Sequence, residues 1–274
     1  AQALMHEQTA LQQREPVRKD RFDEALKVLD EGLALDASDP DLLVARSEIV
    51  AEQGRIARQL GIDPGPFLVE AVRAADAATR AAPSDQGAWE RLAWACLNYA
   101  RELRDARYEV DWAWEKGIAA AQRAGELAPA SSVPPSLLSQ MHTDRAETTE
   151  IRGGDARADV DAALVDARRV AEIGDRPMIS KVLLALALRQ DATSRWSRGE
   201  DADPRFLEAV QVLGEAWKYS EGQVAQASHG VQIAALWAEA ALLEGRAPEA
   251  ALAASADDRE TFVVQNVSFS LRPG

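Results

Sequence analysis

The sequence predicts an all-α protein, folded as a right-handed solenoid of helical hairpins that repeat every 46 residues and have elongated first helices. Two observations support this prediction. Apolar residues make up 47% of the 274 residues and aromatic residues only 5%, and the apolar set is dominated by alanine, the best helix former. In addition, residues of similar size recur at one fixed step along most of the chain, which indicates a repeat architecture.

The 46-residue step is clearest in the second helix of each predicted hairpin. Mostly small residues recur at Gly32, Ala78, Ala124, Val170 and Ala216, and seven positions earlier at Ala25, Ala71, Gly117, Ala163 and Ala209. Large apolar residues recur three positions before these, at Phe22, Leu68, Trp114, Val160 and Phe206. Small residues two turns apart form a narrow stripe on one helix face, so the first helix of each hairpin is expected to pack closely against it.

The turns between the predicted helices follow the same step. Glycines recur at Gly61, Gly153, Gly199 and Gly245, with Arg107 in the vacant place, and acidic residues follow two positions later at Asp63, Glu109, Asp155 and Asp201. A glycine with positive φ satisfies the last carbonyls of a helix. An acidic residue then suits the start of the next helix, where the free N–H groups favour negative charge.

The repeat array is predicted to fill residues 1–252, in units of about 1–37, 38–83, 84–129, 130–175, 176–221 and 222–256. Residues 257–274 form a C-terminal tail that is a candidate cap for the last hairpin. In the unit 84–129, the first helix is expected over 86–106 and the second over 110–127. In the first unit, a turn at Glu15-Pro16 is expected before a helix over 18–35. The start at Ala1 without Met suggests a fragment or a processed chain.

The net charge and the cysteine content indicate which classes of binding partner and which cellular compartment to expect. The net charge of −14 repels phosphate backbones and anionic lipids, so nucleic acid and membrane surfaces are not expected as partners. A neutral to basic protein or peptide is favoured instead. The single cysteine, Cys96, excludes an intrachain disulfide, and the longest apolar run is too short to span a bilayer. With no signal peptide visible, a cytoplasmic location is expected.

Two stretches carry a family resemblance. One contains Ala71, Ala75 and Pro83 followed by Trp89, Leu92, Ala93 and Cys96, and the other contains Phe22, Ala25, Leu29 and Gly32. This order of large residues, small residues and a closing proline resembles the tetratricopeptide repeat (TPR) family over nearly all of residues 1–252. The resemblance implies a non-catalytic stack of hairpins that binds proteins. TPR hairpins have about 34 residues, so a longer first helix is expected here, and HEAT-type repeats are the structural alternative.

A narrower resemblance concerns the segments 60–85 and 197–217, each with an acidic turn before a second helix. They are similar to the expanded TPR arrays found C-terminal to bacterial eukaryotic-like serine/threonine protein kinases. The Gly-rich loop, HRD and DFG motifs of a kinase do not occur in these 274 residues. The resemblance therefore implies a regulatory or docking region, with a kinase domain upstream in the full-length protein.

No residue pattern predicts catalysis, a cofactor or a metal site. His6, His142 and His229 lie in different units, and none has Cys or His at ligand spacing, so structural or solvent-exposed roles are expected. Cys96 falls at an interior position of a first helix and is expected to be a buried small hydrophobe. We therefore expect this region not to be an enzyme.

The candidate binding site is the groove that first helices line in TPR stacks. Positions 46 apart on these helices are mostly polar, which indicates exposure to solvent. The predicted partner-binding residues are Glu48, Glu52, Trp94, Asn98, Arg101, Gln140, Asp144, Gln190 and Gln232. Trp94 is the candidate anchor, because exposed aromatic residues are frequent hot spots of binding. The alternative is that Trp94 packs between adjacent hairpins.

Three functions are compatible with this architecture. The first is a non-catalytic interaction or regulatory scaffold in a larger bacterial signalling protein, such as a serine/threonine kinase. The second is a domain that senses a small molecule or peptide, and the third is an array that self-associates through its open ends. A thermal shift with a small molecule would distinguish the second, and a molecular mass that rises with concentration would distinguish the third.

Overall fold

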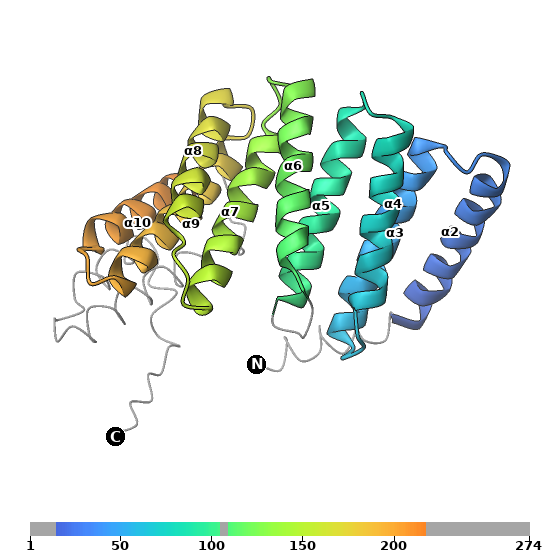
Figure 1. Ribbon diagram of the computed structural model, residues 1–274, viewed down its shortest axis with the longest axis horizontal. Helices are drawn as coiled ribbons and strands as arrows, with labels where there is room; N and C mark the ends of the chain where they lie inside the picture. The colour runs from blue at the N-terminus through green and yellow to red at the C-terminus, as the bar shows by residue number, and fades with distance from the viewer. Residues whose placement is uncertain (1–14, 105–108, 218–274) are drawn as a thin grey trace. The chain divides into compact units, whose positions relative to one another are not determined.

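The computed structural model describes residues 15–104 and 109–217, and all regular structure in these ranges is α-helical (Figure 1). The all-α prediction is therefore confirmed for the described residues. The chain divides into two compact units, one up to Pro129 and one from Ala130. Each unit is considered by itself below. The predicted units 1–37 and 222–256 lie partly or wholly outside the described residues, as does the tail 257–274.

The first unit is a stack of helices in chain order. Its helices are α2 (Glu15–Leu35), α3 (Pro40–Gln59), α4 (Gly65–Ala81), α5 (Gln86–Leu103) and α6 (Asp111–Leu127). Consecutive helices pack against each other, and α3 also packs against α5 (Figure 1). The hairpins α3–α4 and α5–α6 are thus neighbours, with their first helices in contact.

The second unit repeats this arrangement. Its described helices are α7 (Val133–Ile151), α8 (Arg157–Ile173), α9 (Pro177–Ser197) and α10 (Asp203–Trp217). Here α7 packs against α8 and α9, and α9 packs against α10. The unit therefore contains two further hairpins, α7–α8 and α9–α10, whose first helices are again in contact.

The helices keep the predicted 46-residue period. The second helices of four successive hairpins begin at Gly65, Asp111, Arg157 and Asp203, and each start lies 46 residues after the previous one. The first helices contain 20, 18, 19 and 21 residues, whereas the second helices contain 17, 17, 17 and 15. The prediction of long first helices in a 46-residue repeat is confirmed.

The turn glycines end three of the first helices as predicted. Gly61, Gly153 and Gly199 have φ values of 73°, 75° and 71°. Each glycine N–H donates to the carbonyl three residues before it, and the next N–H donates to the carbonyl five residues before it. These are the two bonds of a Schellman motif, which satisfies carbonyls that the helix itself leaves free. Arg107 and Gly245 lie outside the described residues.

Carboxylates start the helices in two periodic rows. Three of the four members of the predicted row accept hydrogen bonds from the backbone two residues on: Asp63 Oδ1 from Gly65 N at 2.9 Å, Asp155 Oδ1 from Arg157 N at 3.1 Å, and Asp201 Oδ1 from Asp203 N at 3.2 Å. A second row caps first helices. Asp39 accepts from Asp41 N at 2.9 Å and Asp85 from Gly87 N at 2.9 Å. Both rows place negative charge where helix N–H groups are free.

Two sequence-based boundaries are wrong. Glu15 and Pro16 do not form a turn before α2 but belong to its first helical turn, a position that tolerates proline because the missing N–H would be unbonded there anyway. The sequence predicts that the first helix of the unit 84–129 reaches Ala106, whereas α5 ends at Leu103. The residues 105–108 lie outside the described ranges.

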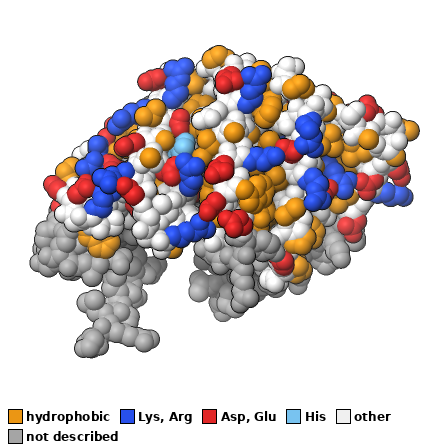
Figure 2. All heavy atoms as spheres, in the orientation of Figure 1, with side chains coloured by type: hydrophobic (Ala, Val, Ile, Leu, Met, Phe, Trp, Pro, Cys, Tyr) orange, Lys and Arg blue, Asp and Glu red, His pale blue; other side chains and the backbone are white. Residues whose placement is uncertain are grey.

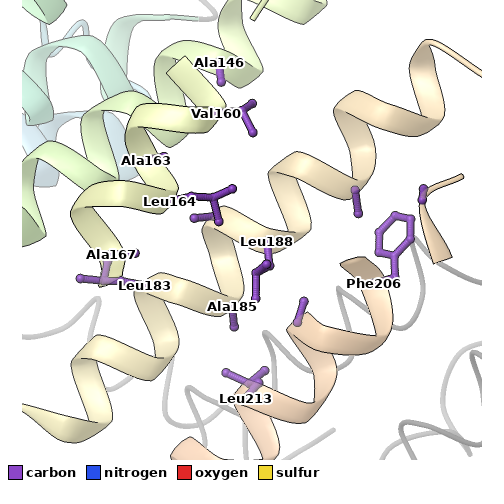
Figure 3. Close-up of a cluster of buried hydrophobic side chains, with 14 of the residues drawn as sticks. Ala146, Val160, Ala163, Leu164, Ala167, Leu183, Ala185, Leu188, Phe206 and Leu213 are labelled. Carbon is purple, nitrogen blue, oxygen red and sulfur yellow. The ribbon is translucent and has the colours of Figure 1, made fainter. Parts of the chain in front are cut away.

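Small residues form the core between paired helices. Ala71, Ala163 and Ala209 are fully buried at one repeat position, and Gly117 is buried at the fourth. In the second unit, Leu164, Leu188 and Phe206 come from three successive helices and join the same buried cluster (Figure 3). The predicted small stripe is therefore buried between the helices. Leu92 and Trp114 are also buried, at 2% and 1% exposure.

Trp89, the large residue that begins the TPR-like stretch of α5, is only partly buried. Its indole Nε1 donates to the carbonyl of Pro83 at 2.9 Å. The side chain thus fixes the connection between α4 and α5 instead of filling the core. This role depends on the polar edge of the indole, which usually finds a hydrogen-bond acceptor.

Gly199 and Gly214 allow a matched test of the helix-ending turns. Because Gly199 has a φ of 71°, we expect Gly199→Ala to lower the free energy of unfolding by about 1 kcal/mol. Gly214 lies in the exposed face of α10, and no atom lies within 4 Å of the position of an added Cβ. We expect Gly214→Ala to raise it by about 0.5–1 kcal/mol. Urea unfolding followed by circular dichroism measures both, and a shift of the same sign in the two variants would contradict the turn assignment.

Candidate functional site

The predicted site residues of the first unit lie on two adjacent helices. Glu48 and Glu52 belong to α3, and Trp94, Asn98 and Arg101 belong to α5, which packs against α3. We call this surface the α3–α5 face and define it by these five residues and Arg91. The helix contact brings together residues that are separated by about one repeat in the sequence.

Trp94 is the large apolar side chain of the α3–α5 face. It is 36% exposed, although its neighbours Ala93 and Ala95 are almost completely buried. The indole therefore projects from a helix that is otherwise packed into the stack. A partly exposed aromatic ring on a rigid helix can contribute a large apolar contact at a small cost in conformational entropy.

Charged side chains form ion pairs on α3 and α5, within each helix and between the two. Arg91 lies one turn before Trp94, and its Nη1 is 3.6 Å from Glu48 Oε1 on α3; the side chains are 14% and 59% exposed. Burial lowers the pKa of Arg91, and its Nε is buried without a hydrogen-bond partner. On α3, Arg55 Nε donates to Glu52 Oε2 at 2.7 Å. Further along, Arg58 Nη1 donates to Glu102 Oε2 at 2.6 Å and so links α3 to α5.

Charged side chains of both signs are spread between hydrophobic ones over the visible surface of the described helices (Figure 2). This composition suits a binding surface that combines one apolar contact with polar pairing.

Sequence reasoning did not select Arg91. A signal was present, because the equivalent positions in the other hairpins are Ala45, Leu137 and Leu183. Leu137 and Leu183 are buried at 0% and 6% exposure. A cation in an otherwise apolar row is therefore the sequence feature that marks this part of the face.

A second exposed tryptophan lies outside the α3–α5 face. Trp112 near the start of α6 is 37% exposed, and its ring lies 4.8 Å from that of Tyr99, measured between ring centroids. The two rings are tilted by 54°, a geometry that aromatic pairs favour. Trp112 and Trp94 thus have nearly equal exposure but belong to the second and the first helix of one hairpin.

The predicted site residues of the second unit are less exposed than expected. Gln140 and Asp144 on α7 are partly buried, and Gln140 Nε2 donates to the Ser136 carbonyl of its own helix at 3.1 Å. Gln190 on α9 is only 3% exposed, and its Nε2 donates to Glu150 Oε2 at 2.7 Å. The expectation that Gln190 faces solvent is wrong, because it forms a buried polar link between α7 and α9. Gln232 lies outside the described residues.

A cluster of titratable side chains joins α7 and α8. His142 Nδ1 lies 3.0 Å from Asp159 Oδ1, and Arg145 Nε donates to both carboxylate oxygens of Asp159 at 2.9 Å. His142 Nε2 lies 3.9 Å from Asp166 Oδ2. Sequence reasoning treated His142 as an isolated histidine, because its carboxylate neighbours are 17 and 24 residues away. Only the packing of the hairpin brings these groups together.

The two carboxyl groups of this cluster are shifted in opposite directions. Burial opposes ionisation of Asp159, but hydrogen bonds from His142 and Arg145 outweigh it and hold the pKa of Asp159 below its ordinary value. Burial raises the pKa of Asp166 to about 6, and the attraction of His142 offsets this only in part. The difference arises because His142 and Arg145 both form hydrogen bonds with Asp159, whereas Asp166 receives only the longer-range attraction of His142.

The next hairpin carries the same ion pair with reversed polarity. Asp191 on α9 occupies the repeat position of Arg145, and Arg205 on α10 occupies that of Asp159. Arg205 Nε lies 2.9 Å from Asp191 Oδ2, and Arg195 Nε donates to Asp191 Oδ1 at 2.9 Å. This pair of repeat positions therefore accommodates a salt bridge in either order.

The described residues contain no group of three His, Cys, Asp or Glu side chains that could hold a metal ion. In the same part of the chain, no helix is both long and apolar enough to cross a bilayer. Cys96 is completely buried in α5, and burial raises the pKa of its thiol to about 12. These features add no chemistry to the α3–α5 face.

The hairpins, their 46-residue register and their contacts define a TPR-like array of helical repeats. No protein-family model matches the chain, and no curated protein matches it. Among solved structures, the chain is similar to a thermophilic TPR protein of Thermus thermophilus, with a TM-score of 0.49 and 16% sequence identity. That match covers 80% of this chain and 93% of the other.

The buried thiol gives a direct test of the α5 packing. Because a thiolate is the reactive form and burial raises the pKa of Cys96 to about 12, we expect the folded chain not to react with an aromatic disulfide reagent at about pH 8. The urea-unfolded chain should release one equivalent of chromophore. Rapid reaction of the folded chain would show that Cys96 is accessible and that α5 packs differently.

Proposed function

We propose that this chain is a non-catalytic interaction module that binds a protein or peptide through the α3–α5 face. The observation that carries the proposal is the partial exposure of Trp94 on a helix whose flanking residues are buried. Stacked helical hairpins offer extended surfaces with satisfied backbone groups, and binding is their common use. The TPR-like arrangement of the hairpins supports a role as a scaffold for protein contacts.

The charge of the chain supports a neutral to basic partner. The net charge is −14, and the Glu48 side chain on the face is 59% exposed. A basic segment would be attracted over a long range and could pair with Glu48, while an apolar side chain of the partner covers Trp94. Glu52, already paired with Arg55 on α3, lies one turn further along the same line of contact.

We further propose a place for the module in a larger bacterial signalling protein, such as a serine/threonine kinase, acting in the cytoplasm. The support is the resemblance of segments 60–85 and 197–217 to the repeat arrays beside such kinases. In that setting the α3–α5 face would dock a substrate or a regulator close to the catalytic domain. The sequence upstream of Ala1 in the full-length gene product tests this context directly.

Replacing Trp94 and Asn98 by alanine tests the binding face. Peptides would first be selected on the immobilised chain from a random phage-displayed library, and we expect them to be rich in Lys, Arg and apolar residues. For the best peptide we expect Trp94→Ala with Asn98→Ala to raise the Kd about thirtyfold, the cost of losing about 2 kcal/mol at a hot spot. Isothermal titration calorimetry measures this Kd, and circular dichroism checks that helicity is retained.

Two other tryptophans provide matched controls. Trp112→Ala removes an equally exposed indole outside the face and should leave the Kd unchanged. Trp114→Ala removes a side chain that is 1% exposed, and we expect it to cost about 3–5 kcal/mol of stability. A stability loss of that size for Trp94→Ala would assign Trp94 to the core. Equal binding by wild type and the double variant would exclude the α3–α5 face as the site.

A further inference from the structure

The hairpin α7–α8 differs from the other hairpins at two positions that face each other. His142 stands where the other first helices have Val50, Cys96 and Leu188, which are 4%, 0% and 0% exposed. Asp166 stands where the other second helices have Ala74, Ala120 and Val212. Two apolar positions of the repeat are thus replaced together by a base and an acid, which packing alone does not require.

The distances indicate that His142 Nε2 and the Asp166 carboxyl share one proton. His142 Nδ1 is 3.0 Å from the Asp159 carboxylate, so the ring hydrogen on Nδ1 is held there. The other ring nitrogen, Nε2, then faces Asp166 Oδ2 at 3.9 Å, with the side chains 11% and 19% exposed. A lone pair on Nε2 and an ionised carboxylate would repel each other, whereas one proton on either group gives an attractive pair.

Other charged side chains on α7, α8 and α9 form ion pairs with residues other than His142 and Asp166. On α7, Arg145 is bound to Asp159, and on α8 Arg169 Nη1 lies 3.1 Å from Glu172. Helix α9 also packs against α7, and on this helix Asp191 pairs with Arg195 and Arg205, and Lys181 pairs with Glu215. Burial raises the pKa of Asp166, and the charge of His142 acts in the opposite direction and lowers it.

We propose that His142 and Asp166 form a pH-sensitive latch between α7 and α8, in which one proton held between imidazole and carboxyl keeps the two helices packed. When the proton leaves, the cluster of His142, Arg145, Asp159 and Asp166 carries a net negative charge that is mostly shielded from water. Packing of α8 on α7 then weakens. This inference is independent of the proposed binding function.

The direction of the pH effect follows from the carboxyl groups. The pKa of Asp166 is raised from 3.8 to about 6 in the folded chain, so the folded state binds more protons than the unfolded state between these values. The stability of the hairpin therefore increases as the pH falls from about 7.5 to about 5. Asp159 does not oppose this, because its pKa lies below 3.8 and it stays ionised throughout this range.

Hydrogen–deuterium exchange of the full chain at about pH 5 and about pH 7.5 tests the latch. We expect protection factors, corrected for the intrinsic exchange rate, to be about tenfold higher at the lower pH in α7 and α8. The raised pKa of Asp166 limits the ratio of the protection factors at the two pH values to about a hundredfold. Partial exposure of Asp166 reduces this ratio further. The α9–α10 hairpin serves as an internal control, because it pairs Asp191 with Arg205 and has Leu188 in place of His142.

Variants separate the latch from a general pH effect. Asp166→Asn should abolish the difference between the two pH values, with protection at the higher pH close to that of the wild type at the lower. The double variant His142→Cys with Asp166→Ala gives the residues of the α5–α6 hairpin and should behave likewise. Asp161→Asn, a change on the exposed face of α8, should retain the wild-type difference.

Three results would overturn the latch. These are equal protection of α7–α8 at the two pH values, an equal change in α9–α10, or a pH response that persists in both Asp166→Asn and the double variant.

Discussion

The close approach of paired helices through small residues is the constraint on which the rest of this fold depends. At one repeat position Ala71, Gly117, Ala163 and Ala209 are all buried, and a larger side chain there would push the first helix away. Because interiors are packed as densely as crystals, that displacement would affect every contact along the hairpin. The alanine-rich composition is thus a condition for the stack and not only a helix preference.

The ends of the helices keep these small residues in register. Schellman motifs at Gly61, Gly153 and Gly199 end three first helices at equivalent positions, and carboxylates two residues later start the second helices. A shift of one residue in such a turn would rotate the following helix by about 100°. The small residues of the second helix would then no longer face the first helix. The packing of the core therefore depends on the hydrogen bonds of the turns.

Repeat positions outside the small stripe differ from hairpin to hairpin, and the charged and titratable side chains of interest lie at these positions. The salt bridge Arg145–Asp159 recurs as Asp191–Arg205 with its polarity reversed, whereas the same two positions hold Tyr99 and Ala113 in the α5–α6 hairpin, so the framework tolerates a salt bridge in either order but does not depend on one. Arg91, His142 and Asp166 interrupt apolar rows of the repeat. The α3–α5 face and the α7–α8 cluster therefore result from local departures from a common framework.

By itself the sequence determined the period, the helix class, the turn glycines and the small stripe, because each depends on neighbours within a few residues or on a recurring distance along the chain. It also selected Trp94 on a mostly polar face of a first helix, but left open whether the ring faces solvent or packs between hairpins. Only the tertiary structure decided which polar residues become buried partners. Gln190 bonds to Glu150 across two first helices, and His142 meets Asp159 and Asp166 from the next helix. These contacts depend on how neighbouring helices rotate and approach, and the repeat period does not specify that.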